Sequence, residues 1–245
     1  MRNFFKVLAL VAVLSPAAAF GAVSTTQHNL SVSGPNTAVR ATTEAGICVF
    51  CHTPHGANQQ RAIWNHVVSG NASFNWGGTT QTTTGTPLPT ALASFSSTTL
   101  KCLSCHDGSV ALGSVTNAGG GVAGVIALGG THQTGGLLNG TAGANRVGFG
   151  GNLSGNHPVG IPYAGQTGSA ITNPVASGYY APTQTGCTNS STWCTTANTN
   201  INLIVNGAVR QVDCTSCHDP HGTTNAYLLV VPTTGSQICL ACHNQ

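Results

Sequence analysis

Four Cys-x-x-Cys-His motifs constrain this chain more than any other feature of its sequence. In this spacing two thiols can add to the vinyl groups of one porphyrin, while the imidazole that follows binds the iron. Zinc ribbons and thioredoxin-like proteins also use Cys-x-x-Cys pairs, but neither needs a histidine directly after the second cysteine. The motifs predict four covalently bound haem c groups with proximal histidines, at Cys48, Cys51 and His52, Cys102, Cys105 and His106, Cys214, Cys217 and His218, and Cys239, Cys242 and His243.

The N-terminus has the pattern of a secretory signal peptide. A basic start is followed by the apolar run Val7 to Leu14 and by small residues from Ala17 to Ala19. We expect a signal peptide over residues 1–22, with cleavage near 19–22. The apolar run is short for a membrane span, so no retained membrane anchor is expected. The predicted location is secreted, extracellular or on the outer cell surface, with the periplasm as the alternative.

Two cysteines lie outside the motifs. Cys187 and Cys194 are close in sequence, and exported proteins fold in an oxidising compartment. We expect them to form one disulfide that closes a small loop; two free thiols are the alternative.

Charged residues are unusually few. The chain has 7 Lys and Arg and 4 Asp and Glu, or 4 % charged residues, against about 25 % in an ordinary globular domain. No basic face is present, so nucleic acid is not an expected partner. Because like-charge repulsion between copies is weak, we expect the protein to assemble. The alternative is a dispersed protein whose surface Ser, Thr and Asn side chains keep it hydrated.

The motifs form a repeat of two pairs. The first and third continue as His-x-Pro-His-Gly, whereas the second and fourth share the form Cys-Leu-x-Cys-His. We expect one tetrahaem domain over residues 23–245, made of a dihaem module at about 28–112, a Gly-rich segment at about 113–207 and a dihaem module at about 208–245. The predicted fold is mostly coil, with short helices at the haem motifs and a few short strands, and with the haems as the core.

The sixth ligand of each iron separates electron transfer from catalysis, because an open position binds small molecules. Methionine is excluded, since the single Met is Met1. His55 and His221 each follow a proximal histidine by three residues, where Pro and Gly direct the chain away from its own iron. We expect His55 to bind the iron of the second motif and His221 the iron of the fourth.

The distal ligands of the first and third motifs are less sharply predicted. His157 precedes a proline in an otherwise loose segment, and His28 lies on the N-terminal arm. Both are candidates, with His66 and His132 as reserves or plain surface histidines. Four bis-His irons predict an electron carrier without catalytic residues, not an enzyme.

The chain resembles the doubled-CxxCH multihaem cytochromes of metal-respiring bacteria, and among them the outer-surface tetrahaem cytochromes of the OmcE type. The resembling segments are His28 to Ser31, Glu44 to His55, Trp64-Asn65, Cys102 to Gly108 and His157 to Gly160. The resemblance implies a homopolymeric extracellular filament that passes electrons among redox proteins and extracellular acceptors. It also implies that one iron takes its distal histidine from the adjacent subunit, for which His28 is the expected donor.

Three other functions stay open at this point. A monomeric periplasmic or surface electron shuttle would carry the same four haems. A reductase of a nitrogen or sulfur oxyanion would need a five-coordinate haem. A membrane-anchored quinol-oxidising tetrahaem cytochrome would keep its N-terminal helix.

Overall fold

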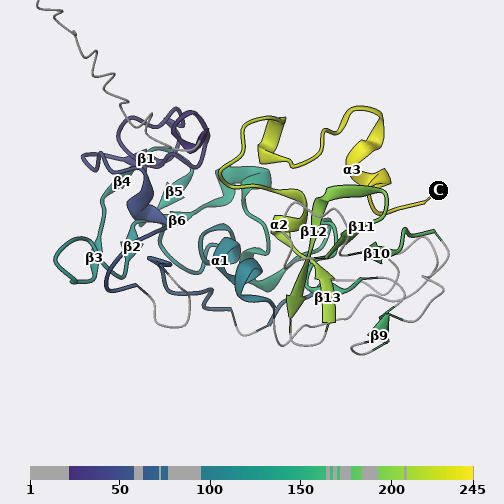
Figure 1. The fold of residues 1–245 in the computed structure, drawn as a ribbon. Coiled ribbons are helices and arrows are strands. Elements are labelled where there is room, and N and C mark those ends of the chain that lie inside the picture. The colour runs from purple at the N-terminus through teal and green to yellow at the C-terminus, as the bar shows by residue number, and fades with distance from the viewer. Residues whose placement is uncertain are drawn as a thin grey trace, which may run out of the picture.

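The structure is a computed structural model, and it is mostly loops joined by short helices and strands (Figure 1). Residues 1–21 of the expected signal peptide and Cys187 of the expected disulfide lie outside the described residues. Within the described part, no helix is long and apolar enough to cross a membrane. The described residues are 22–57, 63–71, 73–76, 95–163, 166–167, 170–171, 178–183, 193–206 and 209–244.

The helices are short, and each Cys-x-x-Cys-His motif lies at one of them. The α-helices are α1 (Ser97–His106), α2 (Cys214–Cys217) and α3 (Gln237–Leu240). The 3-10 helices are η1 (Ala22–Thr25), η2 (Cys48–Phe50), η3 (Gly140–Asn145), η4 (Phe149–Gly151), η5 (Ala226–Leu228) and η6 (Thr234–Ser236). The four motifs begin, in chain order, in η2, α1, α2 and α3.

Helix α1 shows how the local sequence determines where a helix begins and where it ends. The Ser96 side chain accepts a hydrogen bond from the N–H of Thr99 and so caps the first turn. The helix ends at the second motif, and Gly108 follows with a φ of 70°, a conformation that favours glycine. The buried side of α1 includes Thr99, Leu103 and Ser104.

The strands form one larger sheet and several two-stranded pairs. The larger sheet has the order β10-β11-β12-β13-β7, with antiparallel neighbours. The strands are β1 (Arg40–Ala41), β2 (Ser114–Val115), β3 (Gly124–Val125), β4 (Leu128–Gly129), β5 (Gln133–Thr134), β6 (Leu137–Leu138), β7 (Ile161–Pro162), β8 (Gln166–Thr167), β9 (Ala170–Ile171), β10 (Pro182–Thr183), β11 (Trp193–Thr195), β12 (Asn198–Asn206) and β13 (Val209–Val212).

Strand β12 is longer than the short strands that the Gly-rich segment predicts. It spans 9 residues, with Ile201 and Leu203 buried in alternation as a half-buried strand requires. Apolar Ile204 and Val205 follow them directly, so the alternation is hidden in the sequence. The strand contacts α2, which carries the third motif.

Side chains form a larger core than the composition suggests. The largest cluster contains Phe74, Trp76, Phe95, Leu103 and Leu153. A second cluster lies beside β1 and β4, and a third joins β12 to the C-terminal segment. The described residues thus supply apolar clusters of their own, and the placing of haems in the core stays a prediction.

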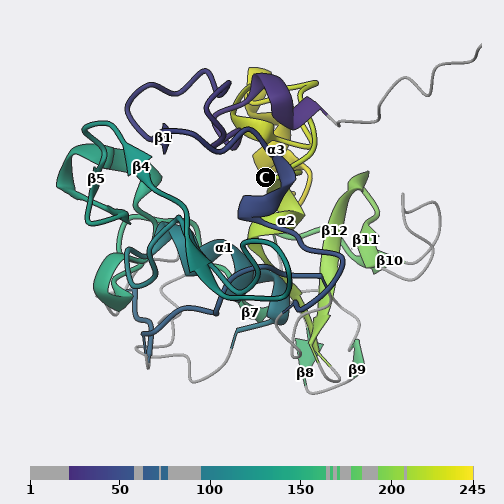
Figure 2. The ribbon, with the colours of Figure 1, turned by 90° about the vertical axis from the view of Figure 1, so that its left-hand side faces the viewer.

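The N-terminal arm is fastened to the body of the molecule. Strand β1 pairs with β4, with Arg40 opposite Gly129 and Ala41 opposite Leu128. Val39 packs in the same cluster as Leu112 and Leu138. Strands β1 and β4 lie side by side in both views (Figures 1 and 2). The segment that carries His28 is thus anchored within its own chain.

Candidate haem-binding site

The cysteines of all four motifs are free thiols, as thioether formation requires. Burial is the largest cause that raises the pKa of four of them, to about 11 for Cys51 and Cys217 and to about 12 for Cys105 and Cys242. Within the described residues, no group of three or more His, Cys, Asp or Glu is arranged to hold a metal ion.

The motifs follow one another in space in their chain order. Cys51 of the first motif acts electrostatically on Cys105 of the second. The thiols of Cys102 and Cys214 share a hydrogen bond, which raises the pKa of Cys102 and lowers that of Cys214. This contact joins the second motif to the third, as does the packing of α1 on α2.

The fourth motif continues the series. Cys239 acts electrostatically on Cys217 of the third motif, and Cys217 acts on Cys242. The two sequence modules are therefore packed against each other through the second and third motifs.

A specific backbone turn holds the histidine of the first motif. The N–H of Thr53 donates to the carbonyl of Ile63 at 2.9 Å, and the N–H of Asn65 donates to the carbonyl of Cys51 at 2.9 Å. Ile63 has a φ of 54°, which is unusual for a β-branched residue. His52 lies between these two bonds.

The third motif repeats the same turn. The N–H of Asp219 donates to the carbonyl of Leu228 at 2.7 Å, and the N–H of Val230 donates to the carbonyl of Cys217 at 2.9 Å. Leu228 has a φ of 59°, matching its counterpart in the first motif. His218 is held in the same way, so the sequence repeat extends to backbone geometry.

Three of the four motif histidines each face one further histidine. The ring centroids are 6.0, 6.0 and 6.4 Å apart in the pairs His28–His106, His52–His221 and His157–His243. An iron between two imidazoles, at metal–nitrogen distances of about 2 Å, leaves ring centroids about 6 Å apart. These three pairs fit the axial ligands of a haem iron.

Two histidines show which ring nitrogen is left for a metal. The Nδ1 of His218 lies 2.9 Å from the carbonyl oxygen of Tyr227, and that of His157 lies 3.0 Å from the carbonyl oxygen of Pro158. A carbonyl only accepts, so Nδ1 carries the proton and Nε2 keeps its lone pair. Metal-binding histidines are usually oriented by such a bond.

Burial favours the neutral form of three of the paired histidines. Burial is the main cause that lowers the pKa of His28 to about 4, and His106 adds to it. Burial, followed by the nearby His221, lowers the pKa of His52, and burial followed by His157 lowers that of His243. Neutral imidazole is the form that binds a metal.

The structure brings together other partners than the sequence predicts. His221 was expected at the fourth motif but faces His52, while His157 faces the fourth-motif histidine instead. His28, expected as the donor to an adjacent subunit, faces His106 of its own chain. The reason is the packing of α1 on α2, which places the third motif beside the first module.

His218 and His55 differ from the paired histidines. Within the described residues, neither ring faces a second histidine ring. His55 is exposed at a cavity of about 760 Å³ that Cys48 and His52 also line. His218 is exposed at a different cavity of about 560 Å³.

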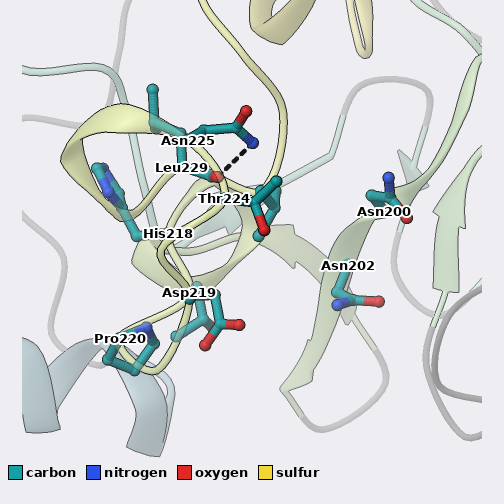
Figure 3. Close-up of a pocket in the computed structure, with 11 residues that line it drawn as sticks. Asn200, Asn202, His218, Asp219, Pro220, Thr224, Asn225 and Leu229 are labelled. Atoms are coloured by element: carbon teal, nitrogen blue, oxygen red, sulfur yellow. Dashed lines mark hydrogen bonds between the residues drawn. The ribbon is translucent and has the colours of Figure 1, made fainter. Parts of the chain in front are cut away.

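The cavity beside His218 has a polar wall. Asn200 and Asn202 come from β12, and the opposite side is the loop that follows the third motif (Figure 3). The side chain of Asn225 donates to the carbonyl of Leu229 at 2.8 Å and braces this loop. His218 is among the residues that line this cavity, and its ring lies on the side of the loop away from Asn200 and Asn202 (Figure 3).

The two reserve histidines do not face a motif histidine. His66 is fully buried and packs against Trp64, so it is a core residue and not a surface histidine. Hydrogen bonds to the backbone of Phe50 and Leu112 partly oppose the lowering of its pKa by burial. His132 lies in the turn between β4 and β5, where its backbone N–H donates to Ala38.

The sequence interpretation missed the aromatic residues at two motifs. The Tyr179 ring lies 4.7 Å from that of His243 between centroids, and Trp64 lies 6.0 Å from His52. The hydroxyl of Tyr163 donates to the carbonyl of Tyr180 at 2.8 Å, close to the fourth motif. The scarcity of aromatic residues in the chain was the available signal.

The structure describes one of the two cysteines of the expected disulfide. Cys194, in β11, is disulfide-bonded. Its expected partner Cys187 lies outside the described residues, so this pairing stays a prediction.

The oriented histidines and the paired rings are compatible with covalently bound haem, for which the motif cysteines would supply the thiols. The family model described as a doubled CXXCH motif matches residues 206–245, which contain the third and fourth motifs. No curated protein matches the chain. The chain carries a paired CXXCH motif, which implies covalently bound c-type haem and suggests a c-type cytochrome involved in electron transfer.

Proposed function

We propose that this chain is a tetrahaem electron carrier in which every haem iron has two histidine ligands. The observation that carries the proposal is the set of three histidine pairs with ring centroids 6.0 to 6.4 Å apart. Bound haem supplies a one-electron Fe(III)/Fe(II) couple. Burial favours the neutral form of His28, His52 and His243, a backbone carbonyl orients His157, and the motif cysteines lie near one another in chain order.

The proposed ligand sets follow from these pairs. His221 completes the first motif, His28 the second and His157 the fourth. A closed iron leaves no position for a substrate, so the pairs support a carrier over a reductase. This is why no catalytic residue is proposed.

We further propose that the chain polymerises into an extracellular filament, as its resemblance to the outer-surface cytochromes implies. Two observations support this step. His218 and His55 are the two candidate ligands without a ring partner among the described residues, and they border different cavities. His55 of one copy is therefore the proposed distal ligand of the His218 iron in the next copy.

The ligand assignment is tested by replacing one distal histidine. In His157→Ala we expect one of four haems to become high-spin, while haem content by pyridine haemochromogen assay stays at four per chain. His132→Ala is the matched control, since its ring faces no motif histidine, and all haems should stay low-spin. Electron paramagnetic resonance distinguishes the two states. Four low-spin haems in His157→Ala would contradict the assignment.

The filament is tested by comparing assembled and separated copies. Electron microscopy of sheared extracellular material should show filaments, and discrete particles alone would support the monomeric shuttle instead. Separated wild-type chains should contain one high-spin haem that becomes low-spin on reassembly. If separated chains keep four low-spin haems, His55 serves its own chain and ligation across copies is wrong.

A further inference from the structure

Two of the four acidic residues of the chain are buried beside haem motifs. Asp107 and Asp213 are each 1 % exposed, whereas the carboxylate of Asp219 is half exposed. In the part of the chain that the structure describes, the one ion pair joins Asp219 to His221 at 3.9 Å. A buried carboxylate without a cation is costly, so its place in the fold needs a reason.

Among the residues that the structure describes, every hydrogen-bond donor to the carboxylate of Asp213 is neutral. Ser96 donates from its hydroxyl to Oδ2, and Gln211 donates from Nε2 to Oδ1 at 3.3 Å. The backbone N–H of Ser216 also donates to this side chain, in a capping box. These dipoles stabilise the negative charge without cancelling it.

Asp213 lies where two motif helices meet. It is the N-cap of α2, which carries the third motif, and its partner Ser96 is the N-cap of α1, which carries the second. The two helices are in contact. The carboxylate also raises the pKa of Cys102, after the larger effects of Cys214 and of burial. Its field therefore reaches the attachment cysteines of both motifs.

We propose that Asp213 is a positioning residue that lowers the reduction potentials of the haems at the second and third motifs relative to the first and fourth. This inference rests on the proposed function. A ferric porphyrin carries one more positive charge than a ferrous one, so a nearby buried anion stabilises the oxidised form. The middle of the haem series is then its low-potential part.

The test is the replacement Asp213→Asn in the haem-loaded protein, followed by a spectroelectrochemical titration. Asparagine keeps the size and most of the capping bonds but removes the charge. At a fixed potential we expect the reduced-to-oxidised ratio of the two lowest-potential haems to rise about tenfold. For a one-electron couple this corresponds to an upward shift of the reduction potential by about 59 mV. The two higher-potential haems should shift much less.

Two matched variants separate charge from structure. Asp219→Asn removes an exposed carboxylate at the third motif, where solvent screens the charge, and should shift the potentials far less. Ser96→Ala removes the link between the helices and keeps the charge, so it should not raise any potential. Unchanged potentials in Asp213→Asn, or the same upward shift in Ser96→Ala, would overturn the proposal.

Haem content and spin state, measured on the same samples, keep the two proposals apart. Four low-spin haems with unshifted potentials refute the role of Asp213 alone. Fewer than four haems in the wild type refutes the proposed function.

Discussion

At the scale of the residue, the described histidines fall into two environments. In each of the three proposed ligand pairs one imidazole ring lies 6.0 to 6.4 Å from another between centroids. His66 is instead enclosed by protein, with 0 % exposure, and burial lowers its pKa to about 4. The same residue type thus has a ligand role in one place and a packing role in the other.

The enclosure of His66 predicts an acid-sensitive fold. The unfolded chain binds a proton at this histidine below pH 6.5, but the folded chain does so only near pH 4, so stability falls as the pH drops between these values. By pH 5 the loss is about 2 kcal/mol. His66→Gln removes the titration and should flatten the dependence of the unfolding free energy on pH, measured in guanidinium chloride at pH 7 and 5. Equal slopes in variant and wild type would contradict this prediction.

At the scale of the element, β12 connects the two halves of the second module. Ile201 on this strand packs with Val231 and Ala241, which adjoins the last motif cysteine. Thr195 of the neighbouring β11 donates its hydroxyl to the carbonyl of Ala241. The sheet therefore holds the fourth motif against the third.

Strand β12 offers a matched pair of core and surface substitutions. Ile201 is 1 % exposed, so Ile201→Ala leaves a cavity in the core. We expect this substitution to lower the unfolding free energy by about 2–4 kcal/mol. Val205 lies on the same strand and is 50 % exposed. We expect Val205→Ala to lower the unfolding free energy by less than about 0.5 kcal/mol. Guanidinium unfolding of the haem-loaded protein measures both. A similar cost for the two would show that the strand does not hold the fourth motif.

The motifs show how far sequence reasoning reaches. The likeness of the first and third motifs is local, and the structure repeats it in the turns around His52 and His218. The partner of each histidine is not local, because it depends on how α1 packs on α2. The sequence spacing alone therefore predicts a partner for His221 within its own module, because the packing of α1 on α2 cannot be read from it. The alternation of β12 was likewise hidden by apolar residues on both faces of the strand.

At the scale of the whole molecule, charge contributes little to cohesion. Within the described ranges, the one ion pair involves a histidine and lies at the surface. Exposed apolar side chains are present instead, among them Tyr227, 82 % exposed, in the loop that orients His218. Contacts between copies would then depend on apolar surface and coordination.

This charge pattern predicts assemblies that resist salt. At about 1 M salt the Debye length is about 3 Å, and surface ion pairs are screened. Filaments should keep the same sedimentation and appearance in negative-stain images at about 0.01 and 1 M sodium chloride. Dissociation at the higher concentration would show that ion pairs between copies, absent from the proposal, hold the assembly.

The pairing of His52 with His221 also has a consequence in time. Under the proposed export the chain emerges N-terminus first, so the first motif is outside long before the segment that carries His221. Closing so distant a contact is among the slower steps of folding. Under the proposed ligand set, the first motif to emerge therefore stays incomplete until the C-terminal quarter arrives, and only then can electrons pass from one end of the molecule to the other.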